Sequence, residues 1–177
     1  MPKYVAFLRG INVGGHNIIR KEKLMDAFTS SGYKDISVYK QSGNVVFSTE
    51  LTDEKLIIEG IKKKLHSTLG SDIGVFLRTV SYLEELVKSN PFGNVNARNA
   101  SRLVTFLPNE TLAQGLPFKI PNSNAEIIRI SKNEAYSVTH GFGEGGNPNP
   151  FLEKKLKVQA TTRNWNIIKE IVEAYSR

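Results

Sequence analysis

Apolar and polar positions alternate along the first half of the chain with the rhythm of short strands and helices. Lys3 to Leu8 is rich in aromatic and β-branched residues and ends at Arg9-Gly10, which is typical of a strand followed by a turn. Lys21 to Ser31 and Asp53 to Leu69 carry apolar residues at helical spacing, and a glycine follows each run. The pattern predicts a strand, a loop and a helix, with a second helix further on.

Three further strands are predicted around the second helix. Asp35 to Lys40 alternates, Asn44 to Ser48 is apolar and β-branched, and the Ser42-Gly43 connection between them indicates a tight hairpin. Ile73 to Val80 returns as a strand after the helix. The order up to this point is βαββαβ, which is the order of the split βαβ, ferredoxin-like unit.

The second half of the chain repeats this rhythm less regularly. Strands are predicted over three runs, Arg102 to Leu107, Glu126 to Ile130 and Ala135 to Thr139. Helices are predicted over four segments, Ser81 to Ser89, Glu110 to Gln114, Phe151 to Val158 and Arg163 to Tyr175, the last with Thr162 as its N-cap. We therefore predict an α+β protein of two ferredoxin-like βαββα subdomains in tandem, a pattern that indicates a duplication sharing an extended core.

The polar stretch Pro91 to Ala100 is the best candidate for a linker between the two halves. This places a first ferredoxin-like subdomain at residues 1–90 and a second α+β subdomain, with the C-terminal helix, at residues 91–177. One intertwined domain is the alternative organisation.

Composition narrows the class of protein. The chain has 177 residues, of which 40% are hydrophobic and 23% charged, a balance typical of a folded globular protein. It has no cysteine, which excludes disulfides and thiolate chemistry and fits a cytoplasmic location. The apolar run Tyr4 to Leu8 is too short for a signal peptide, and no stretch approaches the ~20 apolar residues that span a membrane.

The net charge of +7 favours acidic or phosphorylated partners. The lysine runs Lys62 to Lys64 and Lys154 to Lys157 contribute to this charge, but such runs are also typical of solvated faces. Charge alone therefore leaves the partner open.

The glycine-rich stretch RGINVGGHN, from Arg9 to Asn17, is the first candidate site. In ferredoxin-like topology the end of the first strand and the turn Gln41 to Asn44 share one edge of the sheet, where binding loops are usually carried. Three glycines, Gly10, Gly14 and Gly15, allow a concave anion-binding nest of amides, and Arg9 adds a positive fork. The alternative is an adaptable turn in which Arg9 pairs with a carboxylate.

Several kinds of chemistry are excluded or left without support. Gly10 to Gly15 has the spacing of a nucleotide-hydrolysing phosphate loop, but His16 and Asn17 replace the lysine and hydroxyl that such a loop requires. Histidine spacing indicates no metal site, and Ser42 has no identifiable base. The sequence assigns no catalytic residue, cofactor or oligomeric state, and it leaves open whether the protein is an enzyme.

TTRNWN, Thr161 to Asn166, is the second dense polar stretch. At a helix start, Thr162 would cap the backbone while Arg163 and Asn164 project from the first turn, where free amides favour an anion. Trp165 shares an apolar stripe with Ile168 and is predicted to be in the core.

RGINVGGHN, QSGNVVF and TTRNWN occur in this order along the chain. Together they resemble a bacterial family catalogued as a domain of unknown function, number sixteen ninety-seven, whose members carry LRGINVGG, a QSGNVVF-like hairpin and TTRNWNT. The resemblance covers nearly the full chain and implies a duplicated α+β fold, with no established activity, substrate or cofactor. The family positions are occupied by Arg9, Gly10, Asn12, Gly14, Gly15, Gln41, Ser42, Gly43, Asn44, Thr162, Arg163, Asn164 and Trp165. His16 and Ile167 stand where many members have lysine and threonine.

These patterns favour binding of a small anionic or phosphate-bearing ligand at the strand-end edge formed by Arg9–Asn17 and Gln41–Asn44. The candidate binding residues are Arg9, Gly10, Asn12, Gly14, Gly15, His16, Gln41, Ser42, Asn44, Thr162, Arg163 and Asn164. The alternative is a nucleic-acid-binding or protein-partner-binding regulatory module. SGNVVFST lacks the aromatic pair of an RNA-recognition signature. Tyr39 and Phe47 could face outward, but we expect a second subdomain to bury them.

Overall fold

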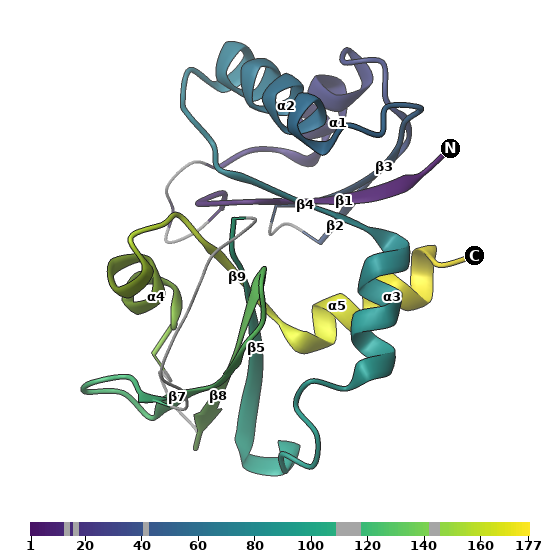
Figure 1. Ribbon diagram of the computed structural model, residues 1–177. Coiled ribbons are helices and arrows are strands. Elements are labelled where there is room, and N and C mark those ends of the chain that lie inside the picture. The colour runs from purple at the N-terminus through teal and green to yellow at the C-terminus, as the bar shows by residue number, and fades with distance from the viewer. Residues whose placement is uncertain (13–14, 16–17, 41–42, 109–117, 142–145) are drawn as a thin grey trace. The chain divides into compact units, whose positions relative to one another are not determined.

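A computed structural model of the 177-residue chain describes residues 1–12, 15, 18–40, 43–108, 118–141 and 146–177 (Figure 1). The chain divides into two compact units, Met1–Leu83 and Glu84–Arg177, and each is described by itself. The division falls inside the helix α3 (Val80–Ser89) rather than in the stretch Pro91 to Ala100.

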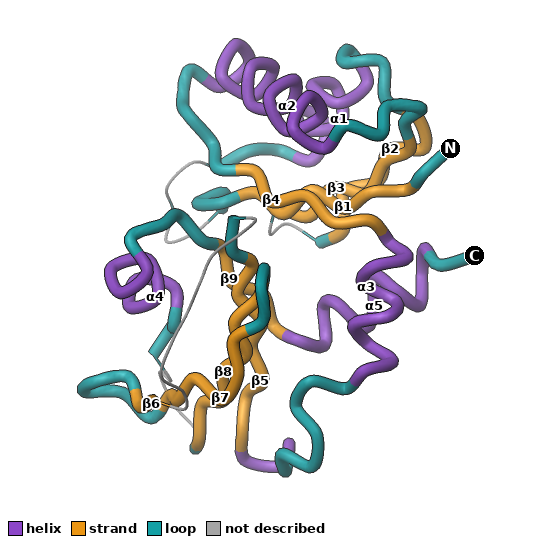
Figure 2. Tube along the Cα trace, in the orientation of Figure 1, coloured by secondary structure: helices purple, strands orange, loops and turns teal. Residues whose placement is uncertain are grey.

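The described residues of the first unit form one antiparallel sheet, two complete helices and the start of α3 (Figure 2). Its elements are β1 (Lys3–Leu8), α1 (Lys21–Thr29), β2 (Lys34–Tyr39), β3 (Asn44–Ser48), α2 (Glu54–Leu69) and β4 (Val75–Thr79). The strand order is β2-β3-β1-β4, and every neighbouring pair is antiparallel. Strands β1 and β2 therefore run in the same direction, with β3 between them. Their carboxyl ends lie at the same end of the sheet, which is the strand-end edge.

The core of the first unit lies between this sheet and its helices, which Figure 1 shows on the same face. The helices contribute buried residues at helical spacing, Leu24, Ala27 and Phe28 from α1 and Ile57, Ile61 and Leu65 from α2. Phe47 of β3 packs among three other rings, with centroid distances of 4.5 Å to Tyr33, 5.4 Å to Phe28 and 5.8 Å to Tyr4. Phe47 therefore faces the helices.

The two helices of the first unit begin differently. Asp53 caps α2, since its side chain accepts hydrogen bonds from the amides of Lys55 and Leu56 at 2.9 and 3.3 Å. Helix α1 follows Arg20, whose side chain makes no capping hydrogen bond. The Arg20 carbonyl accepts a hydrogen bond from the Leu24 amide at 3.2 Å, which is the first hydrogen bond of the helical pattern in α1.

The second unit contains a five-stranded antiparallel sheet in the order β6-β7-β8-β5-β9. Its elements are the end of α3, the 3-10 helix η1 (Ala97–Asn99), β5 (Ala100–Phe106), β6 (Phe118–Lys119), β7 (Ala125–Ile130), β8 (Glu134–His140), α4 (Asn149–Leu156), β9 (Thr161–Asn164) and α5 (Trp165–Tyr175). The four strands β7-β8-β5-β9 occur in the same relative order as β2-β3-β1-β4. The protein therefore has an α+β fold. That its two units are ferredoxin-like, and that they arose by duplication, stays a prediction.

The end of the chain differs from the prediction. Thr161–Asn164 is a strand, not a cap and first helical turn, because it pairs with β5 in a register that sets Thr105 opposite Thr162 and Val104 opposite Arg163. Asn164 is the N-cap of α5 and accepts a hydrogen bond from the Asn166 amide at 2.9 Å. Tertiary pairing thus overrides a local pattern that reads equally well as a helix start.

Two further predictions concern the linker between the two halves and the short helix in the second half. Phe92, inside the predicted linker, is buried and packs on Tyr136 and Trp165 at centroid distances of 5.7 and 5.2 Å, so this segment contributes to the core of the second unit. The predicted helix Glu110 to Gln114 lies outside the described residues. No helix within the described ranges is both long and apolar enough to cross a membrane.

Candidate functional site

The carboxyl end of β1 and the hairpin between β2 and β3 meet at one edge of the first sheet. The Leu8 amide donates a hydrogen bond to the Gly43 carbonyl at 2.8 Å, and Phe7 is paired with Asn44. On the other side, the Arg9 amide donates to the Gly74 carbonyl at 2.8 Å. The start of the loop after β1 is therefore held by backbone hydrogen bonds to two neighbouring segments.

Asn12 closes the same loop on itself. Its Oδ1 accepts a hydrogen bond from the Ile19 amide at 2.8 Å, and its Nδ2 donates to the Ile19 carbonyl at 3.4 Å. Asn12 has a left-handed backbone with φ of 56°, a conformation that asparagine tolerates better than most residues. The Asn12 side chain therefore has a structural role in the loop, because both of its polar atoms are hydrogen-bonded to Ile19.

We expect Asn12→Ala to lower the free energy of unfolding by about 1–2 kcal/mol, because the buried Ile19 amide loses its acceptor. Chemical denaturation followed by far-UV circular dichroism measures the change. Asn12→Asp keeps the acceptor oxygen and should cost less. Equal losses in the two variants would contradict the assigned role of Oδ1.

The other predicted site residues of the first unit divide into three groups. Gly10 and Gly15 are exposed with φ of 71° and 77°, as a turn requires, and Arg9 is half-buried. Asn44 is fully buried, and its Nδ2 donates to the Tyr39 carbonyl at 3.2 Å across the hairpin. Outside the described residues lie Gly14, His16, Gln41 and Ser42.

Thr162, Arg163 and Asn164 belong to the second unit, so their part in the edge formed by Arg9–Asn17 and Gln41–Asn44 stays a prediction. Thr162 donates to Asn149 Oδ1 at 3.0 Å, and the hydroxyls of Thr162 and Thr105 lie 2.7 Å apart. These contacts join β9 to β5 and to the start of α4. Together with the capping role of Asn164, these contacts give the side chains of Thr162 and Asn164 structural roles.

Arg163 is the buried cation of this segment. Its Nη1 donates hydrogen bonds to Thr161 Oγ1 at 2.7 Å and to the Thr162 carbonyl at 2.9 Å. Burial lowers the pKa of the guanidinium to about 10, so the group keeps its charge at neutral pH. Neutral oxygen acceptors therefore compensate part of the cost of burying this charge.

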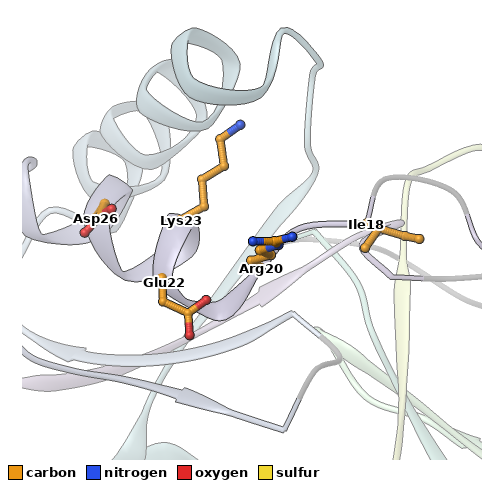
Figure 3. A pocket seen from close by; sticks show the side chains of 5 residues that line it. All are labelled: Ile18, Arg20, Glu22, Lys23 and Asp26. Atoms are coloured by element: carbon orange, nitrogen blue, oxygen red, sulfur yellow. The ribbon is translucent and has the colours of Figure 1, made fainter.

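A cavity of about 160 Å³ lies where the opening loop enters α1, near the carboxyl end of β2. We call it the loop-end cavity; the described residues that line it are Asn12, Ile18, Ile19, Arg20, Lys21, Leu24 and Val38. A broader hollow of about 580 Å³ shares Ile18 and Arg20 with it and continues along α1 to Glu22, Lys23 and Asp26 (Figure 3). The loop-end cavity lies at the same end of the sheet as the hairpin turn, because β1 and β2 run in the same direction.

Arg20 and Lys21 give the loop-end cavity its charge. Both residues are exposed, and neither side chain has an ion-pair partner in the described part of the chain. The N-terminus of α1, which the Arg20 side chain does not cap, adds the positive end of the helix dipole next to them. None of the described lining residues is a carboxylate, so their charges favour an anion.

Sequence reasoning placed the candidate site at the glycines and missed Ile18, Ile19 and Arg20, which follow them. One available signal was the Ile18-Ile19 pair, which lies outside the apolar stripe of α1 and directly before the basic residues that start the helix. The approach of Val38 had no local signal, since it depends on the position of β2 in the sheet.

Neither a metal site nor an aromatic platform is found among the described residues. They contain no group of three histidine, aspartate or glutamate residues that could hold a metal ion. Phe47, considered as an outward platform for nucleic acid, is fully buried in the helix-facing core, and Tyr39 is half-buried. Phe47 is therefore buried, as expected, but in the core of its own unit.

The fold and this edge define a class of α+β proteins with two antiparallel-sheet units, in which glycine-bearing loops meet at a strand end. The chain belongs to the family of proteins of unknown function DUF1697, which matches residues 1–136. It is also similar to the solved structure of the conserved bacterial protein SP0830 from Streptococcus pneumoniae, with a TM-score of 0.70 and 19% identity over 100% of this chain and 99% of that one. The likeness to that structure extends to the fold alone. A comparison with curated proteins found no match.

Proposed function

We propose that the protein binds a small anion at the loop-end cavity, at the strand-end edge formed by Arg9–Asn17 and Gln41–Asn44. The observation that carries this proposal is a cavity whose described lining residues include two cations, Arg20 and Lys21, and no carboxylate. A phosphate or a carboxylate group would meet a guanidinium, which presents a planar fork of donors to either.

The edge supports the proposal by holding the cavity in shape. Asn12 and the paired backbone of Leu8 and Gly43 fix the loop before the cavity, and Leu24 and Val38 anchor its wall in the core. The lining residues Asn12 and Ile19 are already hydrogen-bonded to each other, so ordering these two residues costs little entropy when a ligand binds.

We expect Arg20→Ala to weaken binding of small anions about tenfold or more, since a charge-assisted hydrogen bond contributes roughly 1.5–3 kcal/mol. The measurement is a ¹H–¹⁵N NMR titration of the full chain with inorganic phosphate, sulfate, acetate and isovalerate at constant ionic strength. Wild-type shifts should concentrate on the amides of Ile18 to Leu24.

The matched control is Lys62→Ala, which also removes one exposed positive charge from the first unit, but from α2 and away from the cavity. This variant should bind as the wild type does. Equal weakening in the two variants would mean that net charge attracts the anions, and the proposed site would then be wrong.

A further inference from the structure

We propose that the occupant of the loop-end cavity is a small monocarboxylate with a compact apolar body, such as a branched aliphatic or an aromatic acid. The inference rests on the proposed function, because it names the chemical class of the anion bound there. Three features of the site carry it: the apolar wall, the size, and the distribution of charge along α1.

Apolar side chains form more than half of the lining. Ile19, Leu24 and Val38 belong to the core of the first unit and are only 7%, 2% and 6% exposed. Ile18 is 74% exposed and lines both the cavity and the broader hollow. A fully polar anion gains nothing from these walls, whereas an apolar body releases water from them and from itself.

The size of the cavity limits this body. A volume of about 160 Å³ corresponds to about five water molecules at their share of liquid volume. A branched chain of four or five carbons, or a single ring, therefore suits the cavity better than a nucleoside or an extended chain. The carboxylate of such a ligand would remain at the rim beside Arg20 and Lys21.

Charge along α1 argues for a single negative charge on the ligand. The broader hollow next to the cavity is lined by two cations, Arg20 and Lys23, and two carboxylates, Glu22 and Asp26. Figure 3 shows Glu22 and Lys23 leaving α1 in opposite directions, so they do not converge on one group. A polyphosphate that extended out of the cavity would meet carboxylates, which disfavour a second negative charge.

The test compares anions that differ in their apolar body. Dissociation constants of acetate, isovalerate, benzoate and inorganic phosphate are measured by NMR titration of the full chain at constant ionic strength. We expect isovalerate to bind about tenfold or more tightly than acetate, because three additional carbons leave water. Phosphate should bind more weakly than isovalerate.

Ile18→Ser tests the apolar wall without disturbing the core, since Ile18 is mostly exposed. It should weaken isovalerate about threefold and leave acetate unchanged, while Ile18→Leu should bind both as the wild type does. Leu56→Ser, which removes another exposed apolar side chain from the same unit, is the control and should change neither constant.

Two results would overturn the inference, and they differ in what they mean for the proposed function. Phosphate binding that is tighter than isovalerate binding and depends on Arg20 would reject the monocarboxylate while supporting an anion site. Binding of every anion that is insensitive to Arg20→Ala, or no binding at all, would reject the site itself.

Discussion

Gly43→Ala is expected to lower the free energy of unfolding of the first unit by about 3 kcal/mol. Gly43 has φ of 71°, where a residue with a Cβ is strained by roughly 1–2 kcal/mol. The added Cβ would also lie 3.2 Å from Leu8 Cβ and from the Leu8 carbonyl oxygen, and 3.4 Å from Ile11 Cβ. Leu8 and Ile11 are buried, so they have little room to move, and overpacking adds roughly 1–3 kcal/mol.

Gly10→Ala separates the two causes. Gly10 has the same φ of 71°, but no atom lies within 4 Å of the Cβ it would gain. Its cost should therefore be the conformational strain alone, about 1–2 kcal/mol. Chemical denaturation followed by far-UV circular dichroism compares the variants, and equal losses would contradict the crowding at Gly43.

The second large effect is expected for Phe47→Ala, which should cost about 3–5 kcal/mol. Phe47 is fully buried and in contact distance of three other aromatic rings, so its removal leaves a cavity and breaks favourable ring pairs. The only tryptophan, Trp165, lies in the second unit. Far-UV circular dichroism reports both units, while tryptophan fluorescence reports the second, and together they assign the loss to a unit.

Phe47→Leu is the control for this prediction. It keeps most of the buried volume and should cost less than Phe47→Ala, while an exposed Phe47 would make both substitutions nearly neutral. A nearly neutral Phe47→Ala would indicate that this side chain faces outward, and would support the nucleic-acid hypothesis.

The glycine-bearing motifs at the sheet edge have a shared structural meaning. The carbonyl of Gly43, in QSGN, accepts a hydrogen bond from the Leu8 amide. Gly43 also lies close to Leu8 and Ile11, which flank the start of the opening loop. Asn12 then holds that loop to Ile19, one residue before Arg20. Gly43 and Asn12 thus have structural roles at this edge, and the proposed ligand contacts come from Arg20 and Lys21, which follow the motif.

TTRNWN has a comparable meaning in the second unit. Thr162 joins β9 to β5 and α4, Asn164 caps α5, and Trp165 packs on Phe92 at a centroid distance of 5.2 Å. The buried Arg163 is the charged member of this segment, and its guanidinium donates hydrogen bonds to the Thr161 hydroxyl and the Thr162 carbonyl within β9.

Sequence by itself determined the elements whose patterns are local. The spacing of Ile57, Ile61 and Leu65 marks the buried face of α2, because a helix repeats every 3.6 residues. The positions of β1, β2 and β3 follow from β-branched runs, and Gly43 follows from the tight turn between two of them. The meeting of the β1 end with the hairpin also follows from the element order, since few topologies bury such a chain.

Only the tertiary structure decided which polar residues are free to bind. Asn12 and Thr162 carry the same kinds of polar groups as a binding residue would, but those groups are hydrogen-bonded within the fold, Asn12 to Ile19 and Thr162 to Asn149. Thr161 to Asn164 form a strand because they pair with β5, and no local sequence pattern predicts this pairing. The loop-end cavity exists because Val38, from a distant strand, closes a wall that Ile19 and Leu24 begin.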